Sequence, residues 1–470
     1  MMWSDDRRWL RLSYAYGVLV AVALGYFLMR IPIQVSDTFG DVVSLSQPMS
    51  DLVKSQLSGS SFLRPGRYVE AKLVYELANG QYHYAFRLVH VAHVVLLVIL
   101  IVRLLRPTTA AAALLIPLTL AVLIGNHTFA WTLREAFPIN HYLTVVVACA
   151  AAANLAFASH RWWIDALAVV LFVAASLTIE SGLLVWVVFV AAYAVGLRGV
   201  SARGVLAVTA CLAAYFVLRF AILDVGPPTL LDREAGIGFQ RYGGEQLQAM
   251  FGGHVLPFYA YNVVASIAGL LTAEPRNGIF SMTQGLLQST VSPTSIVAAV
   301  SSTIATMLVL RFVWLRRRQW LARRFDRADQ LMVMFWLVFL ANAAMGYAYT
   351  KDVIMAPAGV FFAVAVFVAC GELVQRLSTQ GRASLAILAV LTVLSTTWSI
   401  RAVGIHAALI RTSHDVHEQW AYVDDWLAQL NFPMSPHVIA LKQQLQDDAV
   451  VRHPASPLLR ERWTRLFEVE

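Results

Sequence analysis

Two carboxylates stand at the start of the first polar segment of the chain. Asp37 and Asp41 lie four residues apart, shortly after an apolar run that ends near Leu28. A carboxylate at a membrane boundary can act as a general base on an incoming hydroxyl, because apolar neighbours raise its pKa. The same spacing also suits a short helix or turn that Asp37 caps. Spacing alone leaves both interpretations open.

Basic residues follow in the same segment and at the ends of later apolar runs. Arg64 and Arg67 belong to the first polar segment, Arg219 ends one apolar run, and Lys351 precedes another. Arginine offers a planar set of donors that suits a phosphate. Glu180 is expected at the same depth as Arg219, so Arg219 either pairs with Glu180 or binds a phosphate, and both can hold at different stages.

A polar stripe enters the second apolar run. His83, Arg87 and His90 recur at i, i+4 and i+7, and His93 lies beside them. His90 and His93 have a spacing that allows metal ligation, but no third ligand is near in the sequence. The alternative is a hydrogen-bonded interior of a helix bundle. No metal site or cofactor is therefore predicted, and a divalent metal is left open.

Composition identifies the class of protein that must position these residues. Of 470 residues, 59% are hydrophobic and 14% are charged, whereas soluble proteins have about 25% charged residues. The formal net charge of +8 comes largely from arginines in a few connections, which is a membrane-topology signal and argues against nucleic acid as a partner. The three cysteines lie inside apolar runs, which argues against disulfides and metal clusters.

The apolar runs predict an all-α polytopic membrane protein with about eleven spanning helices. One further apolar stretch, 254–271, is interpreted as re-entrant or interfacial, because a span there would put Arg316–Arg318 on the wrong side. Alternation places the arginine-rich connections and the N-terminus in the cytoplasm and the C-terminus outside it. The predicted runs are 12–28, 84–105, 108–126, 140–158, 162–179, 182–198, 204–222, 293–315, 331–349, 353–375 and 384–403.

Two regions are expected outside the regular spans. The first extracytoplasmic loop, 32–82, is long for a connection and is expected to hold juxtamembrane helices and part of the site. Residues 1–403 form the predicted transmembrane module, and 404–470 form an extracytoplasmic amphipathic tail. Its apolar face is marked by Trp420, Val423, Trp426 and Leu427.

Six motifs occur in a fixed order over about the first 370 residues. They are Ser36–Asp41, Phe62–Pro65, Phe86–His93, Leu177–Gly182, Tyr215–Phe220 and Lys351–Gly359. In this order they resemble the GT-C superfamily of membrane glycosyltransferases, especially its O-mannosyltransferase-like members, here without tetratricopeptide repeats. Ile179 stands where the family has a basic residue, Lys351-Asp352 stands in place of Glu-Arg, and Met355 stands where a tyrosine is usual.

The resemblance implies an inverting glycosyltransferase of a bacterial inner membrane, with an extracytoplasmic active site. It implies Asp37 as general base with Asp41 as auxiliary acid, and a polyprenyl-phosphate-linked sugar as donor. The acceptor would be a glycan, a lipid or a protein, and membrane lipids would surround the enzyme. The residues expected to bind substrate are Arg64, Arg67, His90, His93, Glu180, Arg219 and Lys351. The alternatives are a transporter or flippase of lipid-linked saccharides, and an O-antigen ligase or polymerase.

Overall fold

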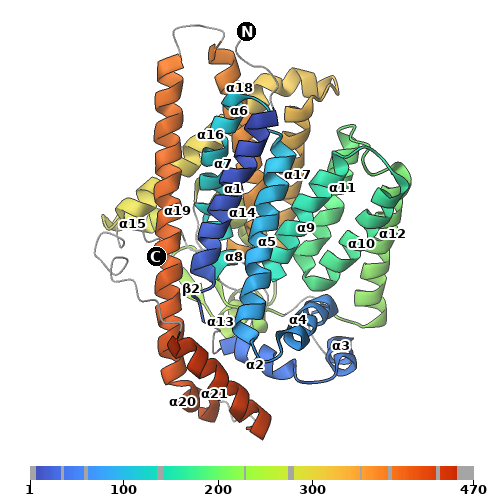
Figure 1. The fold of residues 1–470 in the computed structure, drawn as a ribbon, viewed down its shortest axis with the longest axis vertical. Helices are drawn as coiled ribbons and strands as arrows, with labels where there is room; N and C mark the ends of the chain where they lie inside the picture. Colours follow the sequence, from blue (N-terminus) through green and yellow to red (C-terminus); the bar gives the residue numbers. More distant parts are fainter. Residues whose placement is uncertain are drawn as a thin grey trace.

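The described part of the chain is a bundle of helices. The computed structural model describes residues 7–32, 36–57, 62–134, 141–226, 229–273, 280–349, 352–378, 384–429 and 434–451. Within these ranges the only sheet has two short strands. Most helices stand side by side along the long axis of the molecule (Figure 1). Helices bond their own backbone groups, as a membrane requires, and the apolar helices described next indicate a multi-pass membrane protein.

Six described helices are long and apolar enough to cross a membrane. The three cysteines of the chain are free, and Cys149 and Cys370 are buried. The six helices are α1 (Arg7–Leu28), α5 (Tyr82–Leu105), α12 (Ala202–Phe216) continued by the π-helix η2 (Val217–Ile222), α16 (Pro293–Leu321), α17 (Arg327–Met345) continued by η4 (Gly346–Ala348), and η5 (Asp352–Met355) continued by α18 (Ala356–Ser378).

Five further predicted runs coincide with shorter apolar helices. These helices have 10–17 residues, fewer than the ~20 that cross a bilayer without tilt or thinning. The count of about eleven spans therefore stays a prediction. The shorter helices are α6 (Ala110–Leu114) with α7 (Ile116–Ile124), α9 (His141–Ala156), α10 (Trp162–Thr178), η1 (Glu180–Leu183) with α11 (Leu184–Ala194), and residues Ala389–Ile405 of α19 (Ser384–Ala421).

The stretch 254–271 forms most of α14 (Leu256–Thr272). The preceding helix α13 (Gly244–Phe251) meets α14 at a bend of 118°, the geometry of a broken span or a re-entrant loop. The Thr306 hydroxyl on α16 donates to the Leu271 carbonyl at 2.6 Å, which ties the end of α14 to α16 before the chain continues into α15 (Ser281–Gln288). The re-entrant interpretation stays a prediction.

One end of the bundle gathers the arginine-rich connections. The Arg327 guanidinium, at the start of α17, donates to the Leu104 carbonyl at 2.6 Å and lies over the Phe157 ring. The Gln330 amide donates to the Val195 carbonyl at 3.3 Å. These contacts join the connection between α16 and α17 to the ends of α5, α9 and α11. The connections that the positive-inside rule groups together therefore lie at one end of the molecule.

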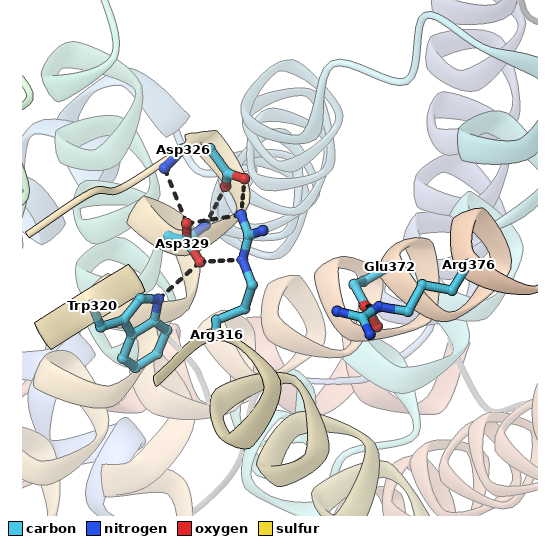
Figure 2. A network of polar contacts seen from close by, with 6 residues as sticks. All are labelled: Arg316, Trp320, Asp326, Asp329, Glu372 and Arg376. Atoms are coloured by element: carbon cyan, nitrogen blue, oxygen red, sulfur yellow. Dashed lines mark hydrogen bonds and ion pairs between the residues drawn. The ribbon is translucent and has the colours of Figure 1, made fainter. Parts of the chain in front are cut away.

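A closed ion network holds this connection (Figure 2). The Asp329 side chain is fully buried and accepts two hydrogen bonds from Arg316, each at 2.9 Å. The Trp320 indole donates to the same carboxylate at 2.8 Å. Asp326 pairs with Arg316 and caps the first turn of α17. Each group has a partner, so the network stabilises the turn between the two helices.

The opposite end of the bundle carries short elements. The predicted helices between the first two spans are present, and Figure 1 shows them below α5, near the C-terminal helices. The strands pair as an antiparallel hairpin with Gly236 opposite Arg241. The short elements are α2 (Ser36–Ser44), α3 (Met49–Leu57), α4 (Pro65–Ala78), α8 (His127–Arg134), η3 (Leu230–Asp232), β1 (Ala235–Ile237), β2 (Gln240–Tyr242), α20 (Val423–Gln429) and α21 (Pro436–Val451).

The C-terminal helices pack on α2. Helix α19 continues through the predicted boundary at 403/404, and its end brings the Trp420 ring edge-on to Phe39 of α2 at 5.9 Å. Trp420, Val423 and Leu427 are buried, as members of one apolar cluster with residues of α2. The side chain of Trp426 lies outside the described residues. The apolar face predicted for the tail thus covers the helix that carries Asp37 and Asp41.

The Asp329 network predicts a large difference between two neighbouring aspartates. We expect Asp329→Asn to lower the free energy of unfolding by about 3–5 kcal/mol, because Arg316 then keeps a partly buried charge without its main partner. Asp326→Asn keeps a residue suited to capping and removes a largely exposed charge, so it should cost about 1 kcal/mol or less. Thermal unfolding in detergent measures both, and equal losses would contradict the assignment.

Candidate functional site

Arg64 reaches the site from the start of α4. Pro65 occupies the first turn of this helix, where its missing N–H leaves no bond unmade. A Cβ at Gly66 would lie 2.9 Å from the Leu177 carbonyl oxygen, so only glycine lets α4 approach α10 this closely. The sequence Arg64-Pro65-Gly66 therefore fixes where α4 begins and how closely it packs on α10, and this places Arg64.

Glu180 lies where the chain turns from α10 into α11. Ile179 is extended, and Glu180 opens the 3-10 turn η1. A Cβ at Gly182 would lie 2.0 Å from the Ala175 carbonyl oxygen, so a side chain there would prevent this tight reversal. The break in regular helix places a carboxylate at the helix ends, where it is free to accept hydrogen bonds from other segments.

The Glu180 carboxylate joins two arginines. Arg64 donates to Oε2 of Glu180 through Nη2 at 2.6 Å and through Nε at 3.0 Å. Arg219 donates to Oε1 through Nη1 at 3.3 Å. Pairing with Glu180, one of the two interpretations that the sequence left open for Arg219, is therefore present in the structure, and Arg64 joins it.

A π-helix presents Arg219 to this carboxylate. Helix α12 widens into η2 at Val217, and Arg219 lies in this wider turn. Such turns are rare and occur frequently at functional sites. The Arg219 side chain is buried and also donates to the Tyr215 hydroxyl at 3.1 Å and to the Val225 carbonyl at 3.4 Å. These contacts fix the guanidinium at the wall of a cavity.

The cavity has a volume of about 270 Å³ and combines cations with aromatic walls. Arg64, Glu180 and Arg219 line it, and so does Arg233, which the sequence had not indicated. Arg233 follows η3 and lies over the Tyr349 ring, 3.6 Å from its centroid. Further aromatic residues of the wall include Phe62, Tyr142, Tyr215 and Tyr347.

The cavity also reaches the outer surface of the bundle. Phe216 and Phe220 line it, yet their side chains are 41% and 46% exposed. Their rings stack on one another with centroids 5.9 Å apart. Both belong to the apolar helix formed by α12 and η2, most of whose surface is unburied. An apolar chain lying against this helix would therefore meet the mouth of the cavity.

The histidine stripe on α5 mainly contacts the end of α1. The His83 ring is 2.9 Å from the Met29 carbonyl oxygen, and Arg87 donates to the carbonyls of Ile31 and Pro32 at 2.9 and 3.2 Å. These carbonyls follow the end of α1 and lack helical partners. His90 is buried against Arg87. None of these α5 residues lines the cavity.

His93 instead forms a second polar cluster with two other helices. Its Nε2 is 3.8 Å from Oε1 of Glu70 on α4 and 3.5 Å from the Thr144 hydroxyl on α9. Thr144 also donates to Glu70 at 3.4 Å. Burial raises the pKa of the Glu70 carboxyl, and His93 and Thr144 oppose this effect. The cluster can hold a proton between a carboxylate and an imidazole.

Several predicted site residues are not placed with the cavity. Arg67 lies near the Tyr68 ring and is not among the residues that line the cavity. Asp37 and Asp41 lie on α2, but their side chains are outside the described residues, as is Lys351. In the described part of the chain, no three His, Cys, Asp or Glu side chains are close enough to hold a metal.

Arg233, Tyr347 and Tyr349 are the residues that sequence reasoning missed. Arg233 stands in Asp232-Arg233-Glu234, which resembles a solvated loop, and the tyrosines precede the Lys351 motif. The only sequence signal was the run Tyr347-Ala348-Tyr349 at the end of an apolar segment. Their meeting depends on the packing of η3 and η4 against the same cavity.

The bridging carboxylate predicts energetic coupling. Glu180→Gln and Arg219→Leu should each lower the melting temperature, and the double variant should lose less than the sum, with a coupling of about 0.5–3 kcal/mol. Arg241, exposed on β2, supplies the control. Glu180→Gln combined with Arg241→Gln should be additive to within about 0.5 kcal/mol. Strict additivity of the Glu180 and Arg219 changes would contradict the bridge.

The raised pKa of Glu70 predicts a specific pH dependence. The folded protein holds the Glu70 proton more tightly than the unfolded chain, whose pKa is near 4.5. This contribution to stability is therefore full below pH 4.5 and is lost as the pH rises through the folded value. The glutamine side chain of Glu70→Gln stays neutral at every pH. As the pH rises from about 4 to 7, this variant should therefore lose less stability than the wild type.

Melting temperatures across this pH range measure the effect. Glu76→Gln is the matched control, because Glu76 lies on the same helix but is mostly exposed. Glu76 pairs with Lys72 at 3.3 Å, so this variant should melt lower than the wild type, by a nearly constant amount across the range. A constant difference between Glu70→Gln and the wild type over the whole range would contradict the predicted protonation.

The geometry of the cavity carries the functional argument, since comparisons with protein-family models, curated proteins and solved structures gave no match for this chain.

Proposed function

We propose that the protein is an inverting glycosyltransferase that uses a polyprenyl-phosphate-linked sugar as donor. The observation that carries this proposal is the cavity in which Glu180 bridges Arg64 and Arg219 behind an apolar mouth. Guanidinium groups suit phosphate, and the exposed rings of Phe216 and Phe220 suit a lipid chain. A ligand with a charged head and a long apolar tail matches both parts.

The Arg64–Glu180–Arg219 bridge prepares the site for an anion. Glu180 keeps the two guanidinium groups paired and in fixed positions. Each guanidinium has further donors, because arginine carries five N–H bonds. A phosphate can bind these donors without first reorganising the side chains, which is how preorganised sites stabilise developing charge. Arg67, His90, His93 and Lys351 stay predicted contacts of the substrate.

The chemistry requires one base and a cationic site for the leaving group. The acceptor hydroxyl oxygen attacks the anomeric carbon, and the bond from this carbon to the phosphate oxygen breaks with inversion. The electron pair stays on the phosphate, and the acceptor proton passes to a carboxylate. We assign this base to Asp37, with Asp41 as the auxiliary acid. Both lie on α2, directly after the first apolar helix.

The proposal includes the placement of the chain in its membrane. About eleven spans, a cytoplasmic N-terminus and an extracytoplasmic C-terminus in a bacterial inner membrane would put the cavity on the extracytoplasmic face. The arginine-rich connections at the opposite end support this orientation. A water-borne glycan or protein, or a second lipid, could then reach α2 as acceptor.

Asp37→Asn is the decisive variant for this function. It should keep its melting temperature and its binding of the lipid-linked donor, while the transfer rate falls by about 10²–10⁴-fold, the usual loss for a missing general base. Asp41→Asn should be milder. Purified protein, a radiolabelled polyprenyl-phosphate sugar and separation of the products measure transfer directly.

Two controls define the outcome. Asp51→Asn, on the neighbouring helix α3, removes an exposed carboxylate from the same loop and should transfer at the wild-type rate. If Asp37→Asn transferred sugar at nearly the wild-type rate and Glu70→Gln transferred none, the general base would be Glu70 on α4. If the protein moved intact lipid-linked saccharide across vesicle membranes, and neither the wild type nor any variant transferred sugar, the protein would be a transporter.

A further inference from the structure

Arg233 is buried at the cavity with donors that nothing in the described chain accepts. Its side chain is 3% exposed, and its Nε and Nη2 have no hydrogen-bond partner among the described residues. Tyr349 covers one face of the guanidinium. A buried donor without a partner destabilises the folded protein, and more so when it is charged. A ligand that supplies an acceptor to these donors would remove this cost.

No described carboxylate forms a hydrogen bond or an ion pair with Arg233, and Asp232 acts on it only through its charge. Glu180 is engaged by Arg64 and Arg219, and the Asp232 side chain turns back to Thr229, whose hydroxyl donates to it at 2.8 Å. Burial lowers the pKa of Arg233 to about 10, which still leaves the group charged at neutral pH. Arg233 therefore brings to the cavity wall a positive charge that no carboxylate binds directly.

The total charge of the cavity indicates the kind of anion it takes. Three guanidinium groups and one carboxylate line it, a net charge of two positive. A phosphodiester, such as a lipid-phosphate sugar, carries one negative charge. A phosphomonoester carries between one and two at neutral pH, because its second pKa is about 6. The charge of the cavity therefore matches the phosphomonoester that remains after sugar transfer better than it matches the phosphodiester of the donor.

We propose that Arg233 binds the second negative charge that develops on the departing lipid phosphate. This inference rests on the proposed function. As the acceptor oxygen bonds to the anomeric carbon, the bond between this carbon and the phosphate oxygen breaks, and the electron pair remains on that oxygen. The acceptor proton goes to the carboxylate base. Arg233 is then a catalytic residue, since it stabilises the transition state and the product more than the donor.

Lipid binding without turnover tests this directly. The full chain in detergent is titrated with a polyprenyl monophosphate, with the methyl phosphodiester of the same lipid, and with the free polyprenol. The wild type should bind the monophosphate most tightly and the alcohol most weakly. Arg233→Gln should lose about 10–100-fold in affinity for the monophosphate, the effect of one charged hydrogen-bonding group. Its affinity for the phosphodiester should change little.

Two further variants separate binding from folding. Arg241→Gln removes an exposed arginine from the adjacent hairpin and should keep the wild-type preference. Arg233→Lys keeps the charge and should retain part of the preference. Without lipid, Arg233→Gln should melt no lower than the wild type, because it removes a buried charge that no carboxylate binds directly. A lower melting temperature with an unchanged preference would show that Arg233 is structural and overturn the proposal.

The same titrations distinguish this inference from the proposed function. Sugar transfer by the wild type, with equal preferences in the wild type and Arg233→Gln, overturns the inference and leaves the function standing. A monophosphate preference that depends on Arg233, in a protein that transfers no sugar, supports the anion site and overturns the function. Equal binding of all three lipids by the wild type overturns the inference whatever the transfer rate.

Discussion

The carboxylate of Glu180 is the contact on which the candidate site depends. It bonds Arg64 and Arg219, which come from segments far apart in the chain, so α4, η1 and η2 must meet at one point. An ionisable group at the edge of a membrane is costly without a partner, and this cost disfavours arrangements in which the three segments separate. The aromatic walls of the cavity then follow from the helices that these segments join.

Each member of this bridge lies where a regular α-helix stops. Arg64 precedes α4, Glu180 stands between α10 and α11, and Arg219 lies in a π-helical turn. A regular helix uses its own backbone groups and keeps its side chains on fixed faces, whereas a break lets a polar side chain point along the axis. Gly66 and Gly182 make these breaks close enough for contact. The site thus depends as much on two missing side chains as on the charged ones.

The two ends of the bundle treat charge differently. At one end, Asp329 accepts from Arg316 and Trp320, and the network closes on itself. At the other, Arg233 keeps unpaired donors beside a cavity that reaches the apolar surface. A satisfied network stabilises a turn, whereas an unpaired buried donor is costly. Arg327 at the first end also has an Nε without a partner among the described residues, so it is the cavity beside Arg233, and not the unpaired donor alone, that places the candidate site at the second end.

The sequence by itself determined the helical membrane class, the positions of the apolar runs and the shared depth of Glu180 and Arg219, because run length and the depth of run ends are local properties. It left open whether Arg219 pairs with Glu180 or binds a phosphate. Tertiary structure decided the rest. It brought Arg64 to the same carboxylate, joined Arg233 to Tyr349, and turned Arg87 toward the end of α1. Apolar runs are uniform around the helix, so their pattern does not specify which helices become neighbours or which loops meet between them.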